Sequence, residues 1–226
     1  MTRQLTLASG EFSIVLPGTW AAIPLDDDAE TARHIKNLVT RQVGRNDRLA
    51  RTRREAREEL TDVAEQAKAS GAISLALSLE ILPGVPFPAS LIVTEDAWPD
   101  DLDDPDDLDD PEALGLSDRL RRARPKAEIQ DFVSGPVARL SQVGEIALGS
   151  GTTTNVAAQY WVPAENGTRL FLILVDAPMA EAPDLYLELF DAIVDSMIWI
   201  PDATPSDTSA ASDTSAASDA SAASDS

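Results

Sequence analysis

The chain has 226 residues, no cysteine and a formal net charge of −21, so it has no disulfide framework, thiolate metal site or thiol nucleophile. The negative charge argues against nucleic acid and anionic membrane surfaces as partners. The longest apolar run, Leu170 to Val175, is too short to cross a bilayer, and residues 1–18 lack the pattern of a signal peptide, so we expect a cytoplasmic protein.

The N-terminal part predicts two strands followed by a helix. Residues 4–9 and 11–16 alternate apolar and polar positions, which is the period of a strand. The helix is expected to begin at Asp27, because Glu30 three residues later completes a pattern like a capping box. Gly44 is expected to end it.

A second, longer helix is predicted from Asp47, as its cap, to about Ser70, and it is rich in arginine. Residues 33–57 contain nine Lys and Arg, half of the 18 in the whole chain. The helix also has two i,i+4 ion pairs on its exposed side, Arg51 with Glu55 and Arg54 with Glu58.

Strands dominate the rest of the chain. They are predicted at residues 72–80, 89–95, 127–134, 136–145, 155–163 and 168–178. In the first of these, one face is expected to carry Ile73, Leu75, Leu77 and Leu79. Asn166-Gly167 predicts a tight hairpin, and residues 170–175 are apolar on both faces, which favours a central strand. Short and long helices are predicted at 117–124, capped by Ser117, and at 183–197, with an apolar stripe of Leu185, Leu189, Ile193 and Met197.

This order of elements predicts an α+β fold, an antiparallel β-sheet packed by helices with a two-helix insertion after the second strand. We expect one domain over residues 1–201, including an acidic loop at 96–114. Residues 206–226 repeat the hexad Ser-Asp-Thr-Ser-Ala-Ala with little variation, and this composition predicts a disordered tail over residues 202–226.

Three stretches of the sequence resemble the Mog1/PsbP-like family. They are FSIVLPGTW near the start, AAQYWVP with RLFLILVDAP late in the chain, and LYLELFDAIVDSMIW at the end. The resemblance covers about a third of the chain and implies an α/β/α sandwich with an antiparallel sheet. It also implies a binding or assembly factor, without catalytic residues to assign. The arginine-rich helices and the acidic segment depart from the family pattern.

The acidic segment raises the question of a cation site. In the frame of a calcium-binding EF-hand loop, oxygen ligands would come from Asp101, Asp103, Asp109 and Glu112. However, Pro105 stands where a ligand is needed and Asp106 where the turn needs glycine. A solvated acidic loop is therefore favoured, with weak divalent-cation binding as an alternative.

Two charged surfaces are predicted to contact a partner protein. One is the arginine-rich helix, and the other is the acidic loop. We hypothesise that residues 45–57 and 100–112 also attract each other, within one molecule or between two. Trp98, beside the acidic run, is either an anchor for the partner or a side chain folded back over the sheet edge. The predicted contact residues are Trp98, Arg48, Arg51 and Arg54.

The sequence offers little catalytic chemistry. His34 is the single histidine, and no G-x-S-x-G motif supplies a nucleophilic serine. We therefore predict a non-enzymatic interaction or assembly factor that uses no cofactor and binds an unidentified protein partner. A small hydrolase or lyase with a carboxylate-based site is the alternative, and a weak divalent-cation binder is the third. The sequence predicts no oligomeric state.

Overall fold

The computed structural model describes residues 2–7, 12–18, 20–25, 27–82, 85–99, 115–148, 151–178 and 180–200. Most of the predicted acidic loop and the whole predicted tail at 202–226 lie outside these residues.

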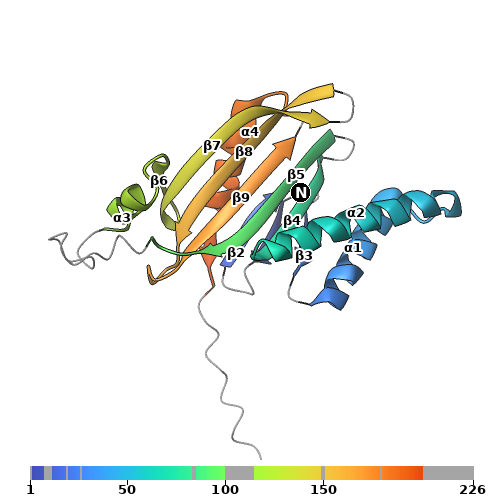
Figure 1. The fold of residues 1–226 in the computed structure, drawn as a ribbon, viewed down its shortest axis with the longest axis horizontal. Coiled ribbons are helices and arrows are strands. Elements are labelled where there is room, and N and C mark those ends of the chain that lie inside the picture. Colours follow the sequence, from blue (N-terminus) through green and yellow to red (C-terminus); the bar gives the residue numbers. More distant parts are fainter. Residues whose placement is uncertain are drawn as a thin grey trace, which may run out of the picture.

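Seven antiparallel strands form the main sheet (Figure 1). Their spatial order is β3-β4-β5-β9-β8-β7-β6, so β9, which contains the doubly apolar run, is the central strand as predicted. The strands are β3 (Ala21–Pro24), β4 (Ala72–Leu82), β5 (Val85–Asp96), β6 (Glu128–Phe132), β7 (Gly135–Leu148), β8 (Gly151–Pro163) and β9 (Leu170–Pro178).

One face of this sheet is covered by a small sheet and the last helix. The small sheet, in the order β1-β2-β10, comprises β1 (Thr2–Leu7), β2 (Phe12–Pro17) and β10 (Ile198–Trp199), and the helix is α4 (Pro183–Asp195). Both pack on the inward side chains of β5, β8 and β9 to form the main core. The stripe predicted for α4 is partly wrong, because Leu185 is 64% exposed, whereas Phe190 and Val194 are buried.

The opposite face carries helices at its two ends. At the β3–β4 end lie α1 (Asp28–Val43), the short 3₁₀ helix η2 (Asp47–Leu49) and α2 (Ala50–Ala69), and near β6 and β7 lies α3 (Leu116–Ala123). Neighbouring residues of β4 show the division, because Leu75 packs against α1 and α2 while Ala76 belongs to the main core. The predicted α+β architecture is confirmed, with helices on both faces.

The two arginine-rich helices follow the third strand rather than the second. The extra strand is β3, which pairs with residues 74–77 of β4. We expected a turn followed directly by the first helix here. A strand of four residues that ends in Pro24 is too short to show a period of two in the sequence.

The helix starts follow capping chemistry, with two corrections. Asp27 caps α1 as predicted, since its Oδ1 accepts a hydrogen bond from the Glu30 backbone N–H at 2.7 Å. The predicted cap at Asp47 is wrong. Asn46 caps η2 by accepting from the Arg48 N–H at 3.0 Å, and α2 follows Leu49 without a side-chain cap. Ser117 does not cap α3 either, because that helix begins one residue earlier, after Gly115.

The hairpin between β8 and β9 forms at the predicted Asn-Gly pair. Gly167 has a φ of 67°, in the left-handed region that favours glycine. The Asn166 side chain accepts a hydrogen bond from the Thr168 N–H at 3.0 Å, which stabilises the turn. In the described part of the chain, no helix is both long enough and apolar enough to cross a membrane.

Candidate protein-contact surface

The residues from α1 to α2 form a helical hairpin that projects past the β3 edge of the sheet (Figure 1). Its fully buried side chains lie at the end near the sheet. There, a cluster with β3 and β4 contains Ile35, Leu38, Val39, Ala64 and Ala67, and Val43, Ala56 and Leu60 are partly buried against it. In α2 the buried side chains are those of Ala64 and Ala67, both in the second half of the helix. The far end of the hairpin is therefore held by the helices themselves.

The far end carries a group of exposed arginines that we call the basic tip. It consists of Arg41, Arg45, Arg48, Arg51 and Arg54. The side chains of Arg51 and Arg54 are 83% and 71% exposed, and they form the predicted pairs with Glu55 at 2.7 Å and Glu58 at 3.8 Å. Pairs this exposed constrain the guanidinium groups little, so these groups can exchange partners at low cost.

Two further residues, Arg53 and Leu49, add a fixed turn and an apolar side chain to the basic tip. Arg53 donates to the backbone carbonyls of Gly44 and Asn46 at 2.9 and 2.7 Å, which fixes the turn between the helices. Leu49, 38% exposed, places an apolar side chain between Arg48 and Arg51 in the sequence. An apolar side chain beside arginines is typical of the residues that contribute most to protein interfaces.

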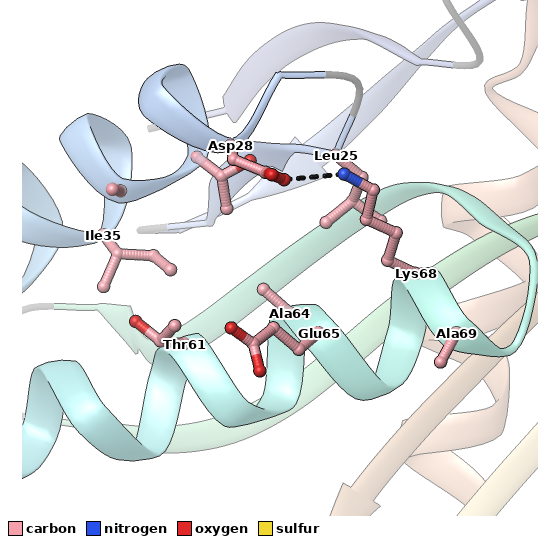
Figure 2. A pocket seen from close by; sticks show the side chains of 10 residues that line it. Leu25, Asp28, Ile35, Thr61, Ala64, Glu65, Lys68 and Ala69 are labelled. Carbon is pink, nitrogen blue, oxygen red and sulfur yellow. Dashed lines mark hydrogen bonds and ion pairs between the residues drawn. The ribbon is translucent and has the colours of Figure 1, made fainter.

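At the opposite end of the hairpin, the helices diverge and leave a groove of about 510 Å³ (Figure 2). Leu25, Ile35 and Ala64 provide apolar surface in it, and Thr31 and Thr61 provide hydroxyl groups. The Thr31 hydroxyl is held by the Pro24 and Asp27 carbonyls at 2.6 and 2.9 Å. The groove has space for one or two side chains of a partner.

Three charged residues line the rim of the groove. Asp28 of α1 and Lys68 of α2 face each other, with 2.7 Å between Asp28 Oδ1 and Lys68 Nζ, and Glu65 lies one turn away on α2 (Figure 2). The hydrogen bond from Lys68 and then its charge lower the pKa of Asp28 below its ordinary value. A carboxylate that acts as a general acid needs the opposite shift, so this pair does not favour the hydrolase alternative.

Trp98 is buried, with 9% of its surface exposed, in a cluster with Leu120 and Trp161. Its indole N–H donates to the Gly167 carbonyl at 3.1 Å, and the Arg119 guanidinium lies 4.1 Å from the centre of its ring. Of the two alternatives for this residue, the structure agrees with the side chain folded back over the sheet. A covered ring has little surface left for anchoring a partner.

The same cluster attaches α3 to the sheet through Asp96. Asp96 Oδ2 accepts from Arg124 at 2.6 Å and from the Trp161 indole N–H at 3.0 Å. The Arg119 guanidinium donates to the Gly167 carbonyl at 2.9 Å, the same oxygen that Trp98 uses. The β8–β9 turn thus fixes both Trp98 and Arg119 through the Gly167 carbonyl. In Figure 1, α3 lies beside β6, away from the hairpin of α1 and α2.

The candidate cation ligands Asp101, Asp103, Asp109 and Glu112 lie outside the described residues. Among the residues the structure does describe, no three His, Asp or Glu gather closely enough to bind a metal ion. His34 lies on α1 with its Nδ1 3.1 Å from the Glu30 carbonyl, as expected for an ordinary helix residue.

No protein-family model and no curated protein matches the sequence. The case for a contact surface therefore depends only on the residues described above. Sequence reasoning predicted Arg48, Arg51 and Arg54, which the structure places in the basic tip. It did not single out Leu49, nor the groove, whose facing residues Asp28 and Lys68 are 40 positions apart.

Proposed function

We propose that this protein is a non-enzymatic interaction factor whose helical hairpin binds an acidic segment of a partner protein. The observation that carries the proposal is the basic tip, where exposed arginines and Leu49 lie at a projecting end that does not pack on the sheet. A partner reaches this end without displacing any contact of the main core.

The charge distribution supports an acidic partner. The five arginines of the basic tip stand against three nearby acids, Asp47, Glu55 and Glu58, in a chain whose total charge is −21. The rest of the molecule repels an acidic segment, so the basic tip defines where such a segment binds. Nucleic acid is also polyanionic, and the overall charge opposes its approach over a wider surface.

The resemblance to the Mog1/PsbP-like family points in the same direction. The three stretches that carry it correspond to β2, the β8–β9 hairpin and α4, which lie together around the main core. An antiparallel sheet with helices on both faces agrees with the sandwich that the resemblance implies. We propose membership of that family, whose proteins act as binding or assembly factors.

A direct test uses a defined acidic probe. Residues 98–114 of this chain contain nine Asp and Glu, and a fluorescein-labelled synthetic peptide of this sequence is a suitable ligand. Its binding to the full chain is followed by fluorescence anisotropy at low and high salt. A matched peptide with Asn and Gln in place of Asp and Glu reports any binding that is independent of charge.

The decisive variant replaces Arg48, Arg51 and Arg54 by alanine. Exposed ion pairs contribute about 0.5 kcal/mol each, so three lost pairs weaken binding by about 1.5 kcal/mol, roughly tenfold in Kd. The control removes the same charge from exposed arginines elsewhere: Arg33, Arg121 and Arg122. Equal losses in both variants, or equal binding of the neutral peptide, would refute the proposal.

A further inference from the structure

The outer edge of β7 is open over most of its length. β6 pairs with β7 over residues 135–139, whereas β7 pairs with β8 on its other side from residue 138 to 148. Among the described residues, no strand pairs with residues 140–148 on the β6 side, and we call this stretch the free edge. Figure 1 shows β7 running along the margin of the sheet past the end of β6.

Every residue from Ser141 to Ala147 is exposed, which is the longest such run among the strand residues whose burial is described. The direction of the backbone groups follows from the β6–β7 turn. Phe132 and Gly135 flank a two-residue turn and exchange hydrogen bonds, so every second residue from Gly135 faces β6. Continued along β7, this alternation directs the N–H and C=O groups of residues 141, 143, 145 and 147 outward.

The outermost strands β3 and β6 are protected from pairing, but the free edge is not. Residues 78–82 of β4, past the end of β3, also have no described partner strand on that side, but Ser78 there is buried. β3 has four residues and ends in Pro24, and β6 has five residues and carries Glu128 and Asp131. Short strands, proline and charge are the usual means of preventing edge-to-edge association. The free edge is longer, contains no proline, and has Glu145 as its one charged residue.

Charge is scarce around the free edge as well. Residues 140–164 contain one charged residue, Glu145, whereas a chain that is 25% charged would place about six in a stretch of this length. Depletion of charge is a mark of the centres of protein interfaces. Because the chain carries −21, two copies repel each other over most of their surface. This patch is where that repulsion is weakest.

Gly144 lies at the midpoint of the free edge. A Cβ atom built on it meets no described atom within 4 Å, and its φ is not in the left-handed region, so neither crowding within the chain nor backbone geometry requires glycine here. Glycine within a strand weakens the strand and often marks the close approach of another backbone. Because no described atom lies that close to Gly144, an approaching backbone has to belong to residues outside the described ones or to another molecule.

We propose that a second copy of this chain occupies the free edge, and that the two β7 strands pair antiparallel about a twofold axis at Gly144. This register uses the whole free edge, since residue 140 then faces residue 148 of the partner. It places Val143 opposite Glu145 of the partner, so no like charges oppose each other. The outward residues 141, 143, 145 and 147 of both copies then form the hydrogen-bonded pairs.

The register predicts opposite effects for two charges at one position. Val143 is 50% exposed, so replacing it leaves the monomer's core intact. Val143→Glu places like charges opposite each other twice per dimer and is expected to weaken association about tenfold, whereas Val143→Lys creates two ion pairs and keeps the dimer. Sedimentation equilibrium over a range of protein concentrations measures both. A wild-type chain that is monomeric throughout, or equal effects of the two variants, would overturn the proposal.

A cross-link tests the axis itself, because the natural chain has no cysteine. In the dimer the two Gly144 residues form a pair that is not hydrogen-bonded, about 4.5 Å between Cα atoms, within the range of a disulfide. Gly144→Cys is therefore expected to form a covalent dimer on mild oxidation. Gln142→Cys is the matched control, since its copies lie about 13 Å apart along the strands. Equal cross-linking of the two variants would contradict this register and the proposal with it.

Discussion

Tyr160 provides a quantitative test of how α4 is attached to the main sheet. The side chain is fully buried on β8, and its hydroxyl donates to Asp191 Oδ1 of α4 at 2.7 Å. Arg139 of β7 contacts the same carboxylate oxygen, with 3.1 Å between Arg139 Nε and Asp191 Oδ1. That N–H is not directed along the line to the oxygen, so the contact is an ion pair without a well-formed hydrogen bond.

Tyr160→Phe removes the hydroxyl and keeps the ring in the core. A hydrogen bond to a charged acceptor contributes about 1.5–3 kcal/mol. The Asp191 side chain is 26% exposed and keeps Arg139 beside it, so water and the guanidinium compensate part of the loss. We therefore expect the free energy of unfolding at pH 7 to fall by about 1.5 kcal/mol, the lower end of that range. Urea unfolding followed by tryptophan fluorescence measures it.

The effect of Tyr160→Phe should also depend on pH. Burial, and then the hydrogen bond and charge of Asp191, raise the pKa of Tyr160 above its ordinary value of 10. Above pH 10 the unfolded chain therefore releases the phenol proton while the folded chain keeps it, and stability is lost as the pH rises. The loss is about 1.4 kcal/mol per pH unit, so the difference between wild type and Tyr160→Phe should nearly vanish by about pH 11.

The control is Tyr186→Phe, which removes the only other phenol of the chain. It keeps Tyr160 and should therefore keep the alkaline loss of stability that Tyr160 causes. If the stabilities of wild type and Tyr160→Phe fall in parallel between pH 8 and 11, the Tyr160 phenol ionises freely in the folded protein, and the reasoning is wrong.

Three further predictions concern the helices and the β8–β9 hairpin. Asp96→Ala leaves Arg124 without its carboxylate partner and should lower the free energy of unfolding by about 1.5–3 kcal/mol, measured with urea. Asp28 should titrate below its ordinary pKa in NMR, and Lys68→Ala should return it to that value; no change would show that the ion pair is absent in solution. Gly167→Ala should destabilise by about 1 kcal/mol or more, because a side chain is placed at a φ of 67° and 3.3 Å from a leucine methyl of α3; a smaller change in thermal unfolding would argue against this strain.

Local chemistry made much of the fold predictable. Strands with clear alternation, the Asp27 cap and the Asn166-Gly167 hairpin each need only a few consecutive residues, and each was found. The expectation for β4 failed at one point. The register shifts between Ala72 and Ser74, so Ile73 packs against the main core rather than beside Leu75. A bulge of this kind leaves no mark on the alternation of residue types.

The site was predictable only where charge density reveals it. The arginines of the basic tip are close in sequence, so a basic surface here could be foreseen, although they lie on α1, the connecting turn, η2 and α2. The neighbours of Trp98 could not be foreseen, because its indole bonds the Gly167 carbonyl 69 positions away, and Arg119 bonds the same carbonyl from 48 positions away. The free edge could not be predicted either. It exists because β6 has five residues and β7 has 14, and this difference in length is not visible in the sequence.

The separation of the apolar interior into clusters on opposite faces of the sheet has a consequence for local opening. Undocking the hairpin exposes the side chains it shares with β3 and β4 and leaves the cluster around β9 and α4 closed. Amide protons in the first half of α2 should therefore exchange with solvent long before those of β8 and β9. The binding element can thus rearrange on a partner while the body of the molecule stays folded.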